Sequence, residues 1–274
     1  MINNNILSYG ITGKFGFKHN KISINFGTKI KCGISNIKNG GLIFHLPIYS
    51  SAIKAVKSNN CKISVLFIPY FVCKKIILEN IYCGIKIIVC ITENISVFDV
   101  LKIKYYCNKY KIFFIGPNSP GIILPFLKIR LGIIPINIIK KGNLAIISKS
   151  GTLTYEAIKI SSKTIGQSIC IGIGGDIITG CNIKNILKIV FLNQLTKKIL
   201  IIGEIGGNIE NIISNFKIKK KIYFYIVGVF SPLEKKMGHA GAINKNINDV
   251  LIKIKKIKKK HIVLNILDEI LFIK

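Results

Sequence analysis

The chain has 274 residues, half of them apolar, which is enough for two ordinary domains with real cores and argues against wholesale disorder. Its formal net charge is +30, but the excess is lysine and Arg130 is the single arginine; base-reading sites rely on arginine, so a dedicated nucleic-acid-binding protein is disfavoured. No apolar run approaches the about 18 residues of a membrane-spanning helix, and the first residues lack a basic segment followed by an apolar stretch, so we expect a cytoplasmic protein without a membrane partner.

Two sets of strand-like segments follow one another along the chain, and segments of helix length separate them. Each strand-like segment is a continuous β-branched run, which is typical of strands buried on both faces of a parallel sheet. The first set comprises residues 6–9, 63–68, 85–91 and 112–115, and the second comprises residues 144–147, 169–173, 199–202, 223–227 and 261–264. The sequence therefore predicts an α/β protein with two doubly wound domains.

The densest cluster of turn-forming residues is GPNSPG at residues 116–121, between the two sets of strands. We place the domain boundary there, with a first domain at residues 1–118 and a second at residues 119–274. The eight cysteines form no CxxC pair and match no zinc module, so we expect reduced, buried thiols and no metal site.

A glycine-rich loop follows the first strand, with the sequence GITGKFG at residues 10–16. Glycines three residues apart permit a tight turn, and a helix starting there would turn its free N–H groups toward the loop. A phosphate-bearing ligand and a purely structural turn are both compatible with this pattern. Thr12 stands where the dinucleotide pattern GxGxxG has its second glycine, which argues against an NAD-dependent dehydrogenase.

Three further segments of the second half carry candidate chemistry. Residues 150–152 (SGT) follow a strand and open a helix, whose N–H groups and hydroxyls suit an anion, although a capped helix start without a ligand is also possible. Glu204 ends a buried apolar run. His239 lies between small residues in MGHAGA at 237–242, which leaves room for a phosphoryl group on its ring. A carboxylate bonded to the other ring nitrogen would set the tautomer of such a histidine.

These segments together resemble the α subunits of succinyl-CoA synthetase. The loop at 10–16 is similar to the family's GFTGxxG loop, and FGTK at 26–29, ITE at 91–93, GPNSPG at 116–121 and MGHAGA at 237–242 match family motifs in the same order. The resemblance covers roughly residues 6–241. It implies an N-terminal Rossmann-like CoA-binding domain and a C-terminal flavodoxin-like domain that carries the phosphohistidine loop, both with mainly parallel sheets.

The resemblance also implies roles for individual residues. Those expected to bind CoA are Gly10, Thr12, Gly13, Lys14, Phe15, Gly16, Lys38, Ile91, Thr92 and Glu93. Those expected in the second domain are His239 as the phosphorylated residue, Glu204 as its partner, Ser150, Gly151 and Thr152 around the phosphate, and Tyr155 beside the substrate. His19 coincides with a family histidine and is expected to have a packing role. The chain departs from the family at residues 36–39, around Lys38, and at residues 244–248, where we expect a shortened or eroded connection.

The implied activity is reversible: succinyl-CoA, phosphate and ADP or GDP give succinate, CoA and ATP or GTP, a step of the tricarboxylic acid cycle, by way of phosphohistidine. The chain has no Walker-type nucleotide loop. The resemblance therefore implies a β subunit that binds Mg²⁺ and nucleotide, in an αβ or α2β2 assembly. Two alternatives stay open at this point: a related acyl-CoA ligase acting on malate or acetate, and a CoA-binding protein that has lost catalysis.

Overall fold

The structure is a computed structural model, and it describes residues 5–204, 220–228 and 247–273. It divides into two compact units. The first comprises Met1–Ile123, Leu127–Ile136 and Ile178–Cys181, and the second comprises Leu124–Phe126, Asn137–Ile177 and Asn182–Lys274. The domain boundary expected between residues 118 and 119 stays a prediction.

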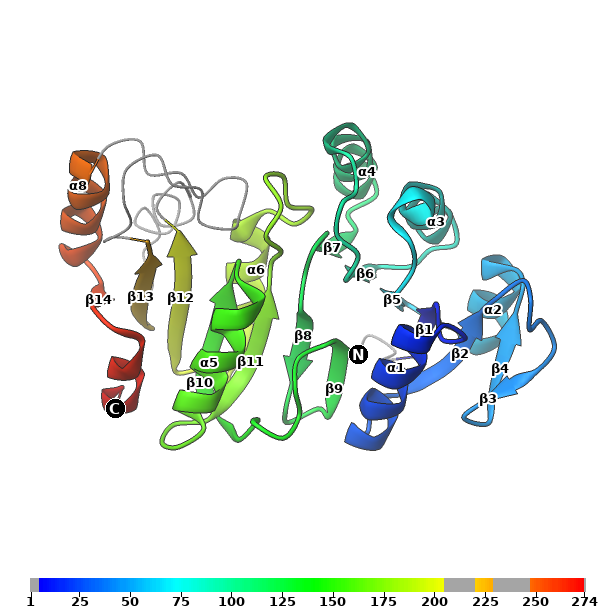
Figure 1. Cartoon of the computed structure of the whole chain (residues 1–274), viewed down its shortest axis with the longest axis horizontal. Coiled ribbons are helices and arrows are strands. Elements are labelled where there is room, and N and C mark those ends of the chain that lie inside the picture. The colour runs from blue at the N-terminus through cyan, green and yellow to red at the C-terminus, as the bar shows by residue number, and fades with distance from the viewer. Residues whose placement is uncertain (1–4, 205–219, 229–246, 274) are drawn as a thin grey trace. The chain divides into compact units, whose positions relative to one another are not determined.

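The first sheet has seven strands in the order β3-β4-β2-β1-β5-β6-β7 (Figure 1). Its strands are β1 (Ile6–Tyr9), β2 (Ile30–Ile34), β3 (Leu42–Ile43), β4 (Leu46–Tyr49), β5 (Ile63–Leu66), β6 (Ile87–Cys90) and β7 (Phe113–Ile115). All neighbours pair in parallel except β3 with β4. Strand β1 lies between β2 and β5, so the strand order runs outward from β1 in both directions. The loop after β1 therefore lies at the topological switch point of the sheet, where ligands of such folds bind.

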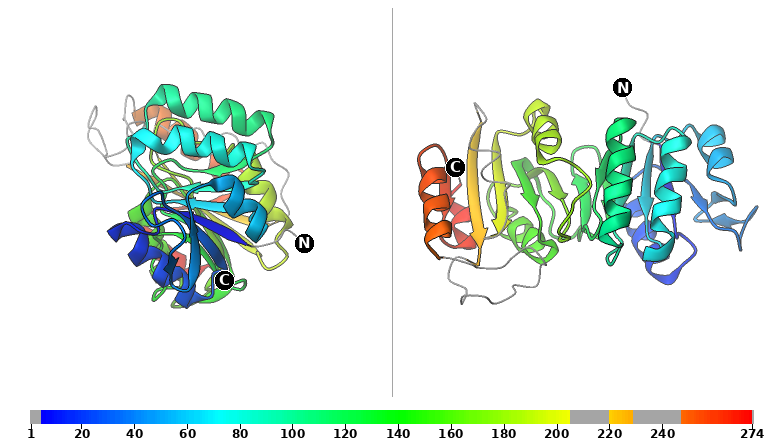
Figure 2. Two further views of the ribbon diagram at one scale, coloured as in Figure 1. Left: turned by 90° about the vertical axis from the view of Figure 1, so that its right-hand side faces the viewer. Right: turned by 90° about the horizontal axis from the view of Figure 1, so that it is seen from above.

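Helices cover both faces of the first sheet. The helices are α1 (Lys14–Phe26), α2 (Ala52–Asn59), α3 (Tyr70–Tyr82) and α4 (Val97–Lys109). Buried residues of α2, α3 and α4 form one apolar cluster with sheet residues such as Leu7, Leu66 and Ile88. Figure 2 shows α3 and α4 side by side, with α1 on the other side of the strands. The β-branched runs of the sequence are thus buried on both faces, as parallel strands require.

The second sheet also has seven strands, in the order β14-β13-β12-β10-β11-β8-β9. Its strands are β8 (Gly121–Leu124), β9 (Ile129–Gly132), β10 (Lys141–Ser148), β11 (Gln167–Gly172), β12 (Lys198–Glu204), β13 (Lys221–Val227) and β14 (Ile262–Leu264). The pairings of β11 with β10, β10 with β12, β12 with β13 and β13 with β14 are all parallel. The predicted α/β class with mainly parallel sheets is confirmed in both parts of the chain.

The helices of the second unit are α5 (Gly151–Ser161), α6 (Ile183–Leu192), α8 (Ile247–Lys258) and the short 3₁₀ helix η1 (Leu267–Phe272). Helices α5 and η1 pack against each other, and α6 covers the opposite face of the sheet (Figure 2). The buried side of α6 consists of Ile183, Ile186, Leu187 and Val190, spaced three or four residues apart as one helix face demands.

The cysteines are all free thiols, and seven of the eight are buried. Cys32 and Cys61 bring their sulfur atoms to 3.8 Å of each other in the core of the first unit. Burial as small apolar groups is thus confirmed for these seven cysteines, and their redox state stays a prediction. In the described part of the chain, no helix is both long and apolar enough to cross a bilayer.

Candidate functional site

The loop after β1 is built so closely that only glycine fits two of its positions. Gly10 has φ +78°, and a Cβ there would lie 2.1 Å from the carbonyl oxygen of Phe67. A Cβ on Gly16 would lie 2.1 Å from the carbonyl oxygen of Gly10. The amide of Gly13 donates to the Gly10 carbonyl over 3.0 Å and closes the turn. The loop backbone is thereby pressed against the first turn of α1.

Helix α1 begins without a side-chain cap, because Gly13 occupies its N-cap position. The N–H groups of a first helical turn have no carbonyl partners within the helix, and they present a positive dipole end. Lys14 and Phe15, the first two residues of the helix, are exposed. The geometry is therefore that of a helix start open to an anionic group from outside.

Neighbouring loops complete this edge of the first sheet. The Thr12 hydroxyl donates to the Ser35 hydroxyl after β2 over 3.4 Å, and the Thr92 hydroxyl after β6 donates to the Ile68 carbonyl after β5 over 2.6 Å. The amide of Asn118 donates to the Thr92 carbonyl over 2.8 Å, which brings in the GPNSPG segment. The structure thus gathers the segments around Gly10–Gly16, Ile91–Glu93 and Asn118 at one sheet edge.

Lys38 lies apart from that contact chain, on an exposed turn after β2. This turn contains the residues 36–39 at which the chain departs from the family, and two hydrogen bonds hold it. The Asn39 side-chain oxygen accepts from the Ser50 amide over 2.9 Å, and the Gly41 amide donates to the Lys38 carbonyl over 3.2 Å. Among the residues that the structure describes, no hydrogen bond joins Lys38 to the glycine loop, so its role in CoA binding stays a prediction.

His19 and Arg130 form a part-buried polar contact beside the glycine loop. Arg130 is 1% exposed, and its Nη2 lies 3.2 Å from His19 Nδ1. Since arginine can only donate, Nδ1 must accept and Nε2 carries the ring proton. The His19 ring packs against the rings of Phe15 and Phe67. Burial, with the charges of Arg130 and Lys18, lowers the pKa of His19 from 6.5 to about 4, so the ring is neutral at physiological pH.

The second candidate site lies where β10 and β12 end. The two strands are parallel neighbours, with Ser148 opposite Ile202, so the residues that follow them meet at one sheet edge. There the Lys149 ammonium lies 2.8 Å from a carboxylate oxygen of Glu204. The two side chains are 15% and 7% exposed. Of the two ion pairs in the described ranges, this one is much the more buried.

Helix α5 begins directly after Lys149. Ser150 is its N-cap, and its hydroxyl accepts from the Leu153 amide over 3.3 Å. Gly151 and Thr152 form the first turn, and Tyr155 is half-buried in the second. Through Lys149, the start of α5 thus lies at the sheet edge where Glu204 ends β12, and such a helix start suits an anion. The roles expected for Ser150, Gly151, Thr152 and Glu204 stay predictions.

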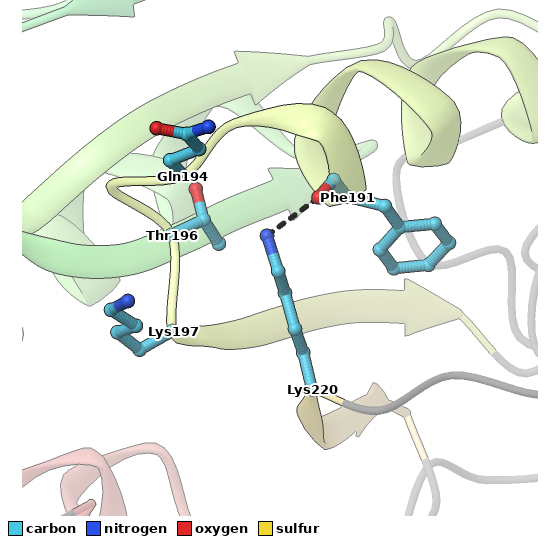
Figure 3. Close-up of a pocket in the computed structure, with 5 residues that line it drawn as sticks. All are labelled: Phe191, Gln194, Thr196, Lys197 and Lys220. Carbon is cyan, nitrogen blue, oxygen red and sulfur yellow. Dashed lines mark hydrogen bonds between the residues drawn. The ribbon is translucent and has the colours of Figure 1, made fainter.

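The expected phosphohistidine, His239, lies outside the described residues, and so do residues 244–246 of the altered segment. The pocket in Figure 3 is a different place: a hollow of about 590 Å³ lined by Phe191, Gln194, Thr196, Lys197 and Lys220. It adjoins the starts of β12 and β13, whereas Glu204 ends β12. No group of three His, Cys, Asp or Glu residues that could hold a metal ion occurs among the residues that the structure describes.

Two of the residues just described had no role assigned from the sequence. Lys149 is one lysine among many, and only the register of β10 and β12 reveals its partner. Arg130 could have been noticed in the sequence, because it is the single arginine among 41 Lys and Arg residues and marks a position where lysine does not replace it. A fork of planar donors, which lysine lacks, explains that choice.

Comparison with known protein families matches both halves of the chain. The CoA binding domain family matches residues 2–94, and the CoA-ligase family matches residues 147–259. The glycine loop of the first sheet lies inside the first match, and the Lys149–Glu204 pair lies inside the second. The fold and the two sites thus define a protein of the CoA-ligase class.

Relatives narrow this class. The chain is 40% identical over 241 residues to the "Succinate--CoA ligase [ADP-forming] subunit alpha 2" of Archaeoglobus fulgidus, covering 87% of this chain and 84% of that one. It is 37% identical over 244 residues to the corresponding α subunit of Aquifex aeolicus, covering 87% and 80%. The chain belongs to the family of succinate–CoA ligase α subunits.

A solved structure shares the fold. The ATP citrate lyase of Methanothrix soehngenii, in complex with citrate and coenzyme A, superposes with a TM-score of 0.84 at 22% identity and covers 98% of this chain. This chain spans 48% of the length of that one. At such identity the likeness concerns the arrangement of helices and strands alone.

Proposed function

We propose that the chain is the α subunit of a succinyl-CoA synthetase that interconverts succinyl-CoA, phosphate and a nucleoside diphosphate with succinate, CoA and the triphosphate. Support comes from the membership of the α-subunit family and from the two sheet edges described above. The observation that carries the proposal is Glu204, a buried carboxylate beside the capped start of α5, inside the part of the chain that matches the CoA-ligase family.

The proposed chemistry has three transfers. A phosphate oxygen attacks the thioester carbonyl, the C–S bond breaks, and CoA leaves as its thiolate with succinyl phosphate formed. An imidazole nitrogen of His239 then attacks phosphorus, the P–O bond to the acyl group breaks, and succinate leaves. A β-phosphate oxygen of ADP or GDP finally attacks phosphorus, the P–N bond breaks, and the triphosphate forms. A covalent intermediate divides one three-substrate reaction into separate steps.

The chain's own residues have distinct tasks in this scheme. The loop of Gly10–Gly16, with Lys38 and Ile91–Glu93, binds CoA through backbone N–H groups and a few side chains. Glu204 accepts a hydrogen bond from His239, which leaves the other ring nitrogen free to attack and stabilises the charge that develops on the ring. Ser150, Gly151 and Thr152 surround the phosphoryl group with donors, and Tyr155 contacts the substrate.

The proposal includes a partner and a location. A β subunit supplies the nucleotide and Mg²⁺, in an αβ or α2β2 assembly, because the chain has no Walker-type loop. Its relatives carry the name of one subunit of a larger enzyme, which supports such a partner. The reaction belongs to the cytoplasm, as expected from the sequence.

The first prediction tests the covalent intermediate. The chain, co-expressed with its cognate β subunit and incubated with ATP or GTP labelled at the γ-phosphate, should take up an acid-labile label on His239. His239→Asn should abolish the label, because the nucleophilic nitrogen is lost. His45→Asn is the matched control: His45 is exposed with φ +60°, a conformation that asparagine tolerates, and its replacement should leave the label intact. Label that persists in the His239→Asn complex would contradict the proposal.

A further inference from the structure

We infer that residues Ile178–Cys181 position the CoA-binding edge of the first sheet. This segment, called the strap below, lies inside the match to the CoA-ligase family, yet it belongs to the first compact unit. It holds the start of the GPNSPG segment, which in turn fixes Thr92, one of the residues expected to bind CoA. The inference rests on the proposed function and adds to it residues that had no role assigned from the sequence.

Three consecutive residues of the strap are anchored in the first unit. The Ile178 side chain packs against the apolar cluster of that unit. The Thr179 carbonyl accepts from the Lys104 ammonium of α4 over 3.0 Å. The Gly180 amide donates to the Gly116 carbonyl, directly after β7, over 2.8 Å. A side chain, a carbonyl and an amide are thus each held by a different part of the unit, which fixes the strap in one position.

Gly180 allows the strap to approach the sheet closely. It is buried, and a Cβ at this position would lie 2.0 Å from Cδ1 of the Phe114 ring, which is itself 1% exposed. A ring in a close-packed core cannot move aside without disturbing its neighbours. Gly180 does not have a positive φ, so the close approach and not the backbone conformation requires glycine here.

The contacts continue from Gly116 to the expected CoA residues. Gly116 lies so close to the end of β6 that a Cβ would be 2.2 Å from the Cys90 carbonyl oxygen. Two residues further along the chain, the Asn118 amide donates to the Thr92 carbonyl over 2.8 Å. The strap therefore acts on Thr92 through a short, buried piece of backbone, and a shift of the strap would be passed on to the sheet edge.

A strap that only stabilised the fold would make the same contacts. The Gly116 carbonyl is buried, and a buried carbonyl without a donor is costly, so the Gly180 amide contributes to stability in either case. The two roles differ in what they predict for a variant that is still folded. A stabilising strap leaves CoA affinity unchanged in such a variant, whereas a positioning strap lowers it.

The second prediction uses this difference, in the full chain in complex with the β subunit. Gly180→Ala should weaken CoA binding at least about 10-fold, a loss of the size that missing support causes at other sites. Calorimetry well below the melting temperature measures it. In the assay of succinyl-CoA formation, the KM for CoA should rise while kcat and the KM for succinate stay unchanged, because a binding contact and not a chemical step is lost.

Val56→Ala is the control for stability. Val56 is buried in the same apolar cluster, on α2, which packs against β2 and β4. This variant should lower the melting temperature, as Gly180→Ala does, but bind CoA like the wild type. Wild-type CoA affinity in Gly180→Ala, or an equal loss of affinity in Val56→Ala, would overturn the inference.

Lys104→Met tests the strap without introducing a clash, so it applies even where Gly180→Ala does not fold. It leaves the Thr179 carbonyl without its donor and should weaken CoA binding roughly 2- to 10-fold, the usual effect of one hydrogen bond. Lys109→Met, at the exposed end of the same helix, removes the same charge and should leave the affinity unchanged. An equal loss in both variants would mean that positive charge, and not the strap, supports the binding of the anionic CoA.

Hydrogen exchange separates this inference from the proposed function, because it needs no CoA. The Asn118 amide should exchange faster in Gly180→Ala and in Lys104→Met than in the wild type, and Val56→Ala should leave it protected. Unchanged exchange at Asn118 would reject the strap's role even if CoA binding falls. A wild-type complex that binds no CoA would instead reject the proposed function, and the exchange rates would still decide whether the strap positions the backbone at Thr92.

Discussion

The N-termini of α1 and α5 are both candidate anion-binding sites, but they differ in how they are capped and in what surrounds them. Helix α1 begins at an uncapped glycine, next to exposed Lys14 and Phe15. Helix α5 begins at Ser150, whose hydroxyl satisfies one of its own amides, and a buried Lys149–Glu204 pair lies beside it. The first start depends on backbone alone, whereas the second is surrounded by side chains that are bonded to one another.

The difference teaches how a site's structure follows from what it must hold. A diffusing ligand such as CoA has to enter and leave, so a helix start with exposed flanking side chains suits it. A phosphoryl group on a histidine is bonded covalently to the protein, and its stabilisation depends on fixed charges and dipoles around it. We therefore expect that substitutions at α1 affect CoA binding, and that substitutions at α5 affect phosphorylation.

The largest effect should come from the glycine loop. A Cβ on Gly16 would meet the Gly10 carbonyl at 2.1 Å, and because this neighbour is backbone, the loop itself must move. Gly16→Ala should weaken CoA binding more than about 100-fold, as calorimetry can measure, and lower the melting temperature. In Gly13→Ala the new Cβ has its nearest neighbour at 3.5 Å, an ordinary contact, so the fold should persist. Normal CoA affinity in Gly16→Ala would contradict this account of the loop.

An intermediate effect should come from the cap of α5. Ser150→Ala should cost about 1 kcal/mol of unfolding free energy, the usual loss for a missing N-cap, and should also slow phosphorylation. Ser51 caps α2 in the first unit, accepting from the Lys54 amide over 3.5 Å, so Ser51→Ala serves as the control. Both variants should lose stability in urea denaturation, but only Ser150→Ala should lose phosphorylation rate. Equal rates in the two would mean that α5 has no special part in the chemistry.

The smallest effect concerns pH and the side of α1 that faces Arg130. The pKa of His19 is lowered to about 4, against 6.5 in an unfolded chain, so its contribution to stability is complete above pH 6.5 and is lost as the pH falls toward 4. His19→Gln keeps an acceptor for Arg130 but does not titrate. Between pH 6.5 and 4, the unfolding free energy of the His19→Gln variant should fall less steeply with pH than that of wild type. The difference in slope should reach at most the value for one bound proton. Identical slopes would show that His19 is not held neutral.

Much of the fold was predictable because most of its strands share one sequence pattern. Each expected strand, from residues 6–9 to residues 261–264, overlaps a real one, because isoleucine-rich runs buried on both faces are easily recognised. Strands β2, β3, β4, β8 and β9 were missed. Lys31 interrupts β2 with an exposed position, and β8 starts at Gly121, inside the GPNSPG cluster that local reasoning takes for a linker. Pairing partners far away in sequence decide such short strands.

The candidate site divides in the same way. Segments whose chemistry is local, such as the glycine loop and the Ser150–Thr152 helix start, were found from the sequence because turns and caps are local. The partners of Glu204 and His19 were not, because Lys149 lies 55 residues before Glu204 and Arg130 lies 111 residues after His19. Side-chain pairs of that kind depend on strand register and on packing, which no local pattern encodes.

Arg130 has a consequence for how the first half of the chain comes to be made. Besides the His19 ring, its guanidinium donates to the His19 carbonyl and the Ser23 hydroxyl, while Thr28 accepts from its amide. During synthesis, the acceptors of helix α1 therefore gain this hydrogen-bond donor only when the chain has grown by a further 107 to 111 residues. A fragment ending at residue 118 would leave these groups without their arginine, whereas one extended to residue 136 would include Arg130 and its hydrogen bonds to α1.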